Sequence, residues 1–318
     1  MRKEAVGESV LSAVGETPLV ALDRLAKGLK GRVLAKLEYL NPGSSVKDRP
    51  ALRIIEDARK SGGLKPGQTV IERTSGNMGT GLAICCAVLG YPLVVVMSEG
   101  NSMERVRMLR ALGAKVVRVA QVDGAPGQVT SKDLQKVEKV TIAMHKKLKA
   151  FRADQFTSPS VVKSHYEGTG AEIWRQTGGD VDCFVGVAGS SGTFTGAVKY
   201  LKEQKPTVKA FTVEPENAAI LSGKVKNPGR HKLQGVGYAD VPQLWDRAMV
   251  DGFVQVTDKE ATETARALAK REGIFCGYTS GANVAAALQL ARKAKKGEVI
   301  VTVICDSGLK YLSTDLFK

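Results

Sequence analysis

Apolar, β-branched runs alternate with helical patterns along the chain, and this alternation predicts strands and helices in turn. The expected strands lie in residues 32–40, 69–76, 92–100, 114–120, 182–189, 209–215 and 299–308. Apolar residues spaced as on one face of a helix predict helices in residues 48–62, 104–113, 196–205, 262–273 and 281–297. Such alternation is typical of parallel sheets with crossover helices, so we expect an α/β fold.

The strand–turn–helix units form nearly equal sets before and after residue 155, which predicts two domains with a cleft between them. Every apolar run is too short to span a bilayer. The N-terminal residues lack the unbroken apolar segment of a secretory signal. We therefore expect a cytoplasmic protein with no membrane partner.

The formal net charge of +15 would suit nucleic acid, a membrane surface or anionic metabolites. The lysines are scattered, however, and aromatic residues make up only 5% of the chain, so surfaces for stacking bases are scarce. We interpret the charge as solvated faces that speed the arrival of anionic ligands, and expect no nucleic-acid partner. The five cysteines fit neither a disulfide framework nor a metal site, and are expected to be buried thiols. The three histidines are far apart, so no metal is expected, and His165 is interpreted as structural.

Two turns between a strand and a helix are rich in glycine and hydroxyl side chains. Residues 189–193, Gly-Ser-Ser-Gly-Thr, follow an apolar strand, and their N–H groups would suit a phosphate. Residues 74–78, Thr-Ser-Gly-Asn-Met, precede an Ala/Gly-rich helix and would suit a carboxylate. The alternatives are a tight turn of small residues at 189–193 and an ordinary helix cap at 74–78.

Lys47 stands at the start of an expected helix, behind a run of small turn residues. The positive character of a helix N-terminus disfavours an ammonium group, so Lys47 is either an indifferent surface charge or a lysine that gives up its proton easily. Thr279 and Ser280 come directly before another expected helix. Their hydroxyls would either cap that helix or hydrogen-bond a heterocyclic nitrogen of a ligand.

Six motifs, in this order and at these spacings, together resemble the cysteine synthase family: NPGSSVKDR at 41–49, TSGNMG at 74–79, GSSGT at 189–193, QGVG at 234–237, GYTSGA at 277–282 and CDSGLKYLST at 305–314. That family comprises the O-acetylserine sulfhydrylases and the catalytic core of the cystathionine β-synthases. The resemblance runs from residue 15 to near the C-terminus. It implies a two-domain, three-layer αβα fold of the fold-type II pyridoxal-phosphate enzymes, with the cofactor in the interdomain cleft.

The resemblance also implies how the two domains divide the work. Residues 1–12 and 41–155 would form a smaller, partly mobile domain that grips the substrate. Residues 13–40 and 156–318 would form the larger domain that holds the phosphate of the cofactor, pyridoxal 5′-phosphate. Lys47 would be the catalytic residue and form the Schiff base with the cofactor. The positive field at its position favours the neutral amine, which is the nucleophilic and basic form.

The remaining roles carry over position by position as implications of the same resemblance. The cofactor-binding residues would be Lys47, Asn77 at the pyridine 3′-oxygen, Gly189, Ser190, Ser191, Gly192 and Thr193 at the phosphate, and Thr279 at the pyridine nitrogen, with Ser280 the second choice there. The substrate-binding residues would be Thr74, Ser75, Gly76, Met78, Gln155 and Tyr238.

The implied reaction is β-replacement on an activated L-serine, O-acetylserine, by sulfide, giving L-cysteine through an α-aminoacrylate. A neutral hydroxyl at the ring nitrogen makes a weaker electron sink than a carboxylate would, so loss of a β-substituent competes well after removal of the Cα proton. The alternatives are condensation of serine with homocysteine, β-replacement using O-phosphoserine or a nitrogen nucleophile, and dehydration. The family further implies a homodimer. The non-enzymatic alternative is a regulatory partner that docks the C-terminal tail of serine acetyltransferase.

Three positions depart from the family's usual pattern. Met78 replaces a threonine, which removes one hydroxyl near the expected substrate carboxylate. Ser191 replaces a glycine and therefore needs a compatible backbone angle. Tyr238 stands where sulfhydrylases commonly have a small residue and cystathionine β-synthases have tyrosine. It is either an aromatic wall of the cleft or a hydroxyl that orients a bulkier second substrate.

Overall fold

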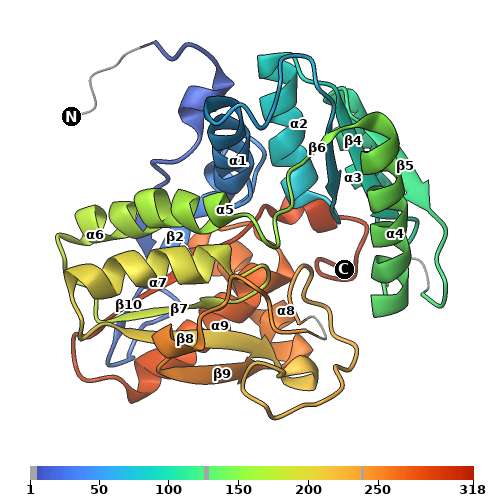
Figure 1. Ribbon diagram of the computed structural model, residues 1–318. Coiled ribbons are helices and arrows are strands. Elements are labelled where there is room, and N and C mark those ends of the chain that lie inside the picture. The colour runs from blue at the N-terminus through green and yellow to red at the C-terminus, as the bar shows by residue number, and fades with distance from the viewer. Residues whose placement is uncertain (1–5, 125–128, 238–239) are drawn as a thin grey trace. The chain divides into compact units, whose positions relative to one another are not determined.

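The computed structural model describes residues 6–124, 129–237 and 240–318. Tyr238, a predicted substrate-binding residue, therefore lies outside the described residues. The chain divides into two compact units. Unit 1 is formed by Met1–Glu16 and Asn41–Asp154, and unit 2 by Thr17–Leu40 and Gln155–Lys318. Both are α/β units, as the alternating pattern predicts (Figure 1).

Unit 1 contains a parallel sheet whose strands, among the described residues, have the order β5-β4-β3-β6. The strands are β3 (Val70–Arg73), β4 (Leu93–Ser98), β5 (Lys115–Val119) and β6 (Phe151–Arg152). The helices are α1 (Asp48–Lys60), α2 (Asn77–Leu89), α3 (Met103–Ala111) and α4 (Ser131–Leu148). Strand β4 is apolar up to its last residue, Ser98, and is buried along its whole length, as expected for an inner strand of a parallel sheet.

Unit 2 contains a sheet whose strands, where the structure describes them, have the order β1-β2-β10-β7-β8-β9. The edge strand β1 is antiparallel to β2, and the other pairings are parallel. The strands are β1 (Leu19–Ala21), β2 (Arg32–Leu37), β7 (Cys183–Val187), β8 (Lys209–Pro215), β9 (Gly252–Val256) and β10 (Val299–Ile304). The α-helices described there are α5 (Pro159–Ser164), α6 (Ala171–Thr177), α7 (Gly192–Gln204), α8 (Asp258–Ala267) and α9 (Tyr278–Lys293).

Successive residues of β7 belong to different cores, because side chains along a strand alternate between the faces of a sheet. Phe184 belongs to a cluster with Phe194 and Leu201 of α7. Val185, the next residue, belongs to a cluster with Ala261 of α8 and with α9. Helices therefore cover both faces of the sheet, which gives the expected three-layer αβα arrangement (Figure 1).

The start of α9 differs from the sequence-based expectation. The helix begins at Tyr278, so Thr279 and Ser280 lie in its first turn and not before it. The residue that precedes the helix is Gly277, which has no side chain to cap it. Helix α1, in contrast, begins at Asp48 as expected, although Lys47 is the N-cap residue directly before it and not just inside its start.

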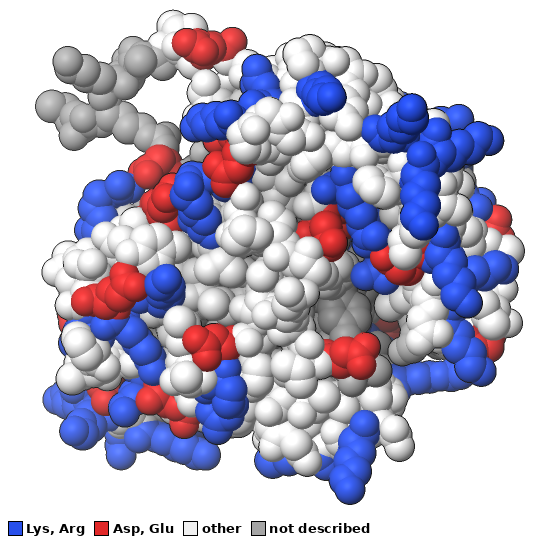
Figure 2. Space-filling model, in the orientation of Figure 1, with Lys and Arg blue, Asp and Glu red and all other residues white. Residues whose placement is uncertain are grey.

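The distribution of charged side chains and the burial of the cysteines agree with the expectations from the composition. Lysine and arginine side chains spread over the face seen in Figure 2, interspersed with acidic ones. Four of the five cysteines are buried and Cys305 is half-buried, and all five are free thiols. Burial raises the pKa of the Cys183 thiol to about 12, so this thiol stays protonated at neutral pH. None of the helices in the described part of the chain is both long and apolar enough to cross a membrane.

Candidate active site

Lys47 is held at the N-terminus of α1 by a hydrogen-bonded loop. The Lys47 N–H donates to Ser45 Oγ (3.3 Å), and the Asp48 N–H donates to the Ser45 carbonyl oxygen (3.3 Å). The buried Asp48 carboxylate accepts from the Gly43 N–H. A carboxylate in the first turn also complements the helix dipole. The loop therefore fixes the backbone of Lys47, whose side chain is half-buried.

Helix α2 approaches α1 closely at Gly81. A β-carbon on Gly81 would lie 2.8 Å from Ala51 Cβ and 3.1 Å from the Lys47 carbonyl oxygen. Both distances are shorter than ordinary van der Waals contact, so the approach requires a residue without a side chain. Asn77, at the start of α2, is about one helical turn from Gly81. The structure thus brings the starts of the two helices that carry Lys47 and Asn77 together within unit 1.

Gly81→Ala is expected to lower the free energy of unfolding by about 1–3 kcal/mol, because an added methyl group in a tight helix contact forces the helices apart. Urea denaturation of the two proteins measures the difference. Gly63→Ala is the matched control in unit 1, since its β-carbon would meet only atoms at 3.4 Å or more. Equal stability of Gly81→Ala and the parent would contradict the close contact.

The turn at 74–78 joins β3 to α2 and depends on a glycine and a buried arginine. Gly76 has φ 147° and ψ −61°, a conformation that only glycine adopts readily. Its N–H donates to Thr74 Oγ1 (3.1 Å). Arg105 of α3, which is 5% exposed, donates from Nη1 to the Ser75 carbonyl oxygen (2.7 Å). Arg105 carried no role in the sequence-based prediction, because nothing in a helical run with several arginines distinguishes the buried one.

Met78 lies in the first turn of α2 and is 1% exposed. Its thioether is thus enclosed. Ser75, in contrast, is exposed, and Asn77 is half-buried. The first N–H groups of an α-helix have no acceptor within the helix. Backbone donors of this turn can therefore bind a carboxylate without the threonine hydroxyl that Met78 replaces.

The loop at 189–193 joins β7 to α7 and has the features of an anion cradle. A β-carbon on Gly189 would lie 2.2 Å from the Gly235 carbonyl oxygen, so these two backbones are in direct contact. Ser191 is the N-cap residue of α7 and has the left-handed angles φ 70° and ψ −7°. Its Oγ is buried and makes no hydrogen bond. A buried hydroxyl without a partner is costly, and a phosphate oxygen beside the N–H groups of this helix would satisfy it.

A buried histidine supports the far end of the same loop. Thr193 Oγ1 lies 3.1 Å from His165 Nε2, and His165 Nδ1 lies 2.9 Å from Thr169 Oγ1. His165 is 0% exposed. The imidazole therefore orients the Thr193 hydroxyl, which agrees with the structural role expected for His165. Its link to the loop had no signal in the sequence, because the two residues are 28 positions apart.

Thr279 and the loop at 189–193 converge on one short segment. Thr279 Oγ1 donates to the Gln234 carbonyl oxygen (3.3 Å), and the next residue, Gly235, contacts Gly189. Ser280, which is 0% exposed, accepts from the Cys305 N–H through its Oγ (2.9 Å). Of the two alternatives for these hydroxyls, capping of α9 is excluded, because Gly277 is the N-cap residue and both hydroxyls bond to other segments. Both hydroxyls are therefore engaged, Ser280 with the end of β10 and Thr279 with Gln234, and the preference for Thr279 as the ligand contact stays a prediction.

The predicted site residues thus form two groups, one in each unit. Lys47 and residues 74–78 belong to unit 1, and residues 189–193 and Thr279 belong to unit 2. Gln155 is the first residue of the second segment of unit 2 and is 7% exposed. The ligand roles of all these residues stay predictions.

Comparison with known proteins identifies similar chains of several named activities. A family model described as pyridoxal-phosphate dependent enzyme matches residues 10–306. Cysteine synthase 3 of Caenorhabditis elegans is 41% identical, over 100% of this chain and 92% of that protein. Cystathionine beta-synthase of Apis mellifera is 38% identical over 96% of this chain, which spans 60% of that longer protein.

Two solved structures have closely similar folds. The cysteine synthase (OASS) of Entamoeba histolytica matches with a TM-score of 0.92 and 37% identity, over 100% of this chain and 92% of that one. An O-ureido-L-serine synthase matches with a TM-score of 0.91 and 38% identity, over 98% of this chain and 96% of that one.

Proposed function

This chain belongs to the family of pyridoxal-phosphate-dependent enzymes, and we propose that it acts as a cysteine synthase, replacing the acetate of O-acetyl-L-serine by sulfide. The observation that carries the proposal is the convergence of the loop at 189–193 and the Thr279 hydroxyl on Gln234–Gly235. This arrangement supplies a phosphate cradle and a neutral hydroxyl within one unit. The similarity to cysteine synthases over nearly the whole chain supports the same reaction.

The residues present fit the cofactor. The buried, unpartnered Ser191 hydroxyl and the N-terminal N–H groups of α7 would hold its phosphate, together with Thr193. Lys47 would carry the cofactor, and Asn77 and Thr279 would hydrogen-bond its ring. Once bound, pyridoxal phosphate supplies an electron sink for the pair that remains at Cα when the proton leaves.

The side chains of the protein would then perform the proton transfers. The neutral Lys47 amine takes the Cα proton of the substrate and later returns it. The turn at 74–78, with Gln155, holds the substrate carboxylate. The Cβ–O bond breaks and acetate leaves with the electron pair, after which sulfide forms the Cβ–S bond. At the ring of the bound cofactor, Thr279 would supply a hydroxyl and not a carboxylate, which would favour departure of the β-substituent.

Ser191→Gly is expected to have opposite effects on folding and on cofactor binding. It should raise the free energy of unfolding of the apoprotein by about 0.5–1 kcal/mol, because a left-handed backbone costs a non-glycine residue about 1–2 kcal/mol and part of this gain is offset by the freedom of glycine in the unfolded chain. It should also weaken binding of pyridoxal phosphate, because a phosphate donor is lost. Ser191→Ala separates the two effects, since it removes the hydroxyl and keeps the strain. Denaturation and cofactor titration of the three proteins provide the measurement.

The test of the reaction is an assay of the purified holoenzyme with O-acetylserine and sulfide. We expect equal amounts of L-cysteine and acetate. Parallel assays replace the donor by O-phosphoserine or serine, and the acceptor by homocysteine. Faster formation of cystathionine from serine would reject the cysteine synthase assignment in favour of the condensation. Release of pyruvate and ammonia without any acceptor would indicate a dehydratase.

A second candidate reaction uses a urea-derived acceptor. The fold matches that of an O-ureido-L-serine synthase almost as closely as that of the Entamoeba histolytica cysteine synthase, with TM-scores of 0.91 and 0.92. Hydroxyurea is the nucleophile whose addition at Cβ would give an O-ureido side chain. Competition between hydroxyurea and sulfide for the same holoenzyme distinguishes the two, and a higher kcat/KM for hydroxyurea would favour this candidate.

The proposal extends to the oligomeric state of the enzyme and to its location in the cell. We expect a homodimer, which light scattering of the holoenzyme would measure, and a cytoplasmic location, which cell fractionation would measure. Binding of a synthetic C-terminal peptide of serine acetyltransferase tests the regulatory alternative. The same proposal includes the two domain roles, in which the smaller domain grips the substrate and the larger one holds the cofactor phosphate. It also includes Tyr238, either as an aromatic wall of the substrate site or as a hydroxyl that orients a second substrate.

A further inference from the structure

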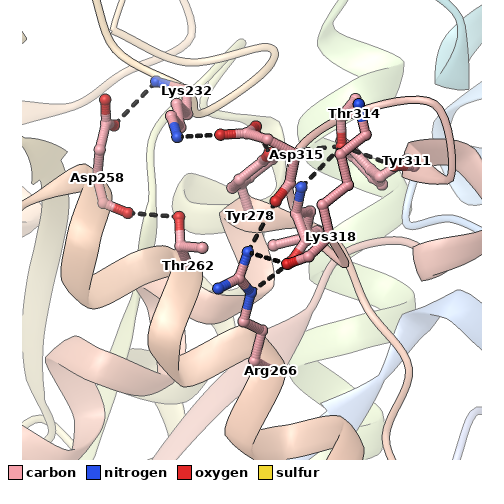
Figure 3. Close-up of polar contacts among 10 residues, drawn as sticks. Lys232, Asp258, Thr262, Arg266, Tyr278, Tyr311, Thr314, Asp315 and Lys318 are labelled. Atoms are coloured by element: carbon pink, nitrogen blue, oxygen red, sulfur yellow. Dashed lines mark hydrogen bonds and ion pairs between the residues drawn. The ribbon is translucent and has the colours of Figure 1, made fainter.

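The C-terminal segment 311–318 is docked onto α8 and α9 by several contacts (Figure 3). Arg266 of α8 donates to the carbonyl oxygens of Asp315 (2.8 Å) and Leu316 (2.6 Å). Leu316 is 0% exposed, and the Phe317 ring lies 4.3 Å from the Phe275 ring between centroids. This segment is therefore a fixed part of unit 2.

The Asp315 carboxylate joins two residues from distant parts of the sequence. One oxygen accepts from the Tyr278 hydroxyl (2.5 Å), and the other forms an ion pair with Lys232 Nζ (Figure 3). The cation and the hydroxyl hold the pKa of Asp315 below its usual range, so the carboxylate is charged at neutral pH. Tyr278 is 2% exposed and directly precedes Thr279. Asp315 thus connects the first turn of α9 to the loop at 232–235.

That loop is the support of the proposed phosphate cradle. The Lys232 N–H donates to Asp258 Oδ1 at the start of α8 (2.8 Å), so the residue is held at its backbone as well as its side chain. Two residues further on, the Gln234 carbonyl oxygen accepts from Thr279. The Gly235 carbonyl oxygen then lies directly against Gly189. Gly235, whose backbone lies against the cradle, is therefore only three positions after Lys232.

We propose that Asp315 and Lys232 are positioning residues for cofactor binding. Together they would fix the position of the loop at 232–235, which contacts the loop at 189–193. The inference rests on the proposed function, in which the loop at 189–193 holds the cofactor phosphate. Both side chains are about half exposed, at 57% and 43%, so the ion pair itself contributes little to global stability. Its effect falls on the local position of the loop and on how long the cofactor stays bound.

The test compares two variants that change the net charge in opposite directions. Lys232→Met removes a positive charge, and Asp315→Asn removes a negative one while it keeps an oxygen for the Tyr278 hydroxyl. If the pair acts by positioning, both variants should release pyridoxal phosphate about threefold to fivefold faster than the parent holoenzyme. If the charges act only through space on the phosphate, Asp315→Asn should release it more slowly, and that result would overturn the proposal.

The readouts are the rate of cofactor release into an excess of a scavenging apoenzyme and the ³¹P chemical shift of the bound cofactor. We expect a shifted ³¹P resonance in both variants, an unchanged melting temperature, and recovery of the parent behaviour in Lys232→Arg. The double variant should be no worse than either single one, because the two residues act through one contact.

Lys202→Met is the matched control. Lys202 forms an ion pair of the same kind with Asp251 (2.6 Å) in unit 2, with side chains that are 24% and 25% exposed. It should release the cofactor at the parent rate. If the parent binds the cofactor and Lys232→Met and Lys202→Met release it at equal rates, the inference is rejected. A parent protein that binds no pyridoxal phosphate would instead reject the proposed function.

Discussion

Lys47→Ala is expected to lower kcat/KM for cysteine formation by about 10³–10⁴-fold, because in the proposed function Lys47 both carries the cofactor and takes the Cα proton. The loop before α1 is fixed by hydrogen bonds from the backbones of residues 43, 47 and 48, and none of these depends on the lysine side chain. The variant should therefore fold normally. Steady-state assays and the melting temperature together measure the effect.

Two comparisons test whether the effect of Lys47→Ala comes from loss of the amine at this position and not from loss of one positive charge. Lys60→Ala removes an exposed lysine from the last turn of the same helix and should leave kcat/KM unchanged. Added methylamine should restore part of the activity of Lys47→Ala, since a free amine can take the proton that the side chain would have taken. Turnover of Lys47→Ala at the parent rate would remove Lys47 from the reaction.

Gly189→Ala is expected to weaken the binding of pyridoxal phosphate by about 100-fold and to lower the free energy of unfolding by about 3 kcal/mol, at the upper end of the cost of overpacking. The added β-carbon would lie 2.2 Å from the Gly235 carbonyl oxygen. Both atoms belong to backbone, so the contact cannot be relieved by rotation of a side chain. The loop at 189–193 or the segment Gln234–Gly235 must move, and either movement would distort the proposed phosphate cradle.

Gly186→Ala is the matched control for this substitution. Gly186 is a buried residue of β7, three positions before Gly189, and its β-carbon would meet nothing nearer than Phe184 Cε1 at 3.5 Å. This variant should bind the cofactor as the parent does. Cofactor titration and urea denaturation of both variants give the two quantities. Parent-like affinity in Gly189→Ala would show that the cradle does not depend on the contact with Gly235.

The sequence predicted those parts of the site that depend on local structure. Lys47 at a helix start and the glycine-rich turns after β3 and β7 could be predicted, because strand periodicity and turn residues are encoded within a few positions. Arg105 and His165 could not. Their importance comes from burial against the turns, which only the tertiary fold creates.

Backbone angles and the first residues of helices are also hard to predict from the sequence when tertiary contacts decide them. From the sequence we expect Ser191, in place of a glycine, to need a compatible backbone angle, but the structure gives it the left-handed φ of 70° that glycine adopts more readily. It did not show that α9 begins at Tyr278, since the three residues Tyr278, Thr279 and Ser280 are poor markers of a helix interior. Their place is decided by packing and by bonds to Gln234 and Cys305.

The order of strands in unit 2 has a consequence for synthesis of the chain on the ribosome. Strand β2, Arg32–Leu37, lies beside β10, Val299–Ile304, so two segments that are far apart in the sequence are neighbours in one sheet. The pairing closes a very long loop, which makes it a late and slow folding event. The β1–β2 pair must therefore wait with an open edge until Val299–Ile304 has emerged. Aggregation during this interval, and its suppression by chaperones, would be governed by that edge.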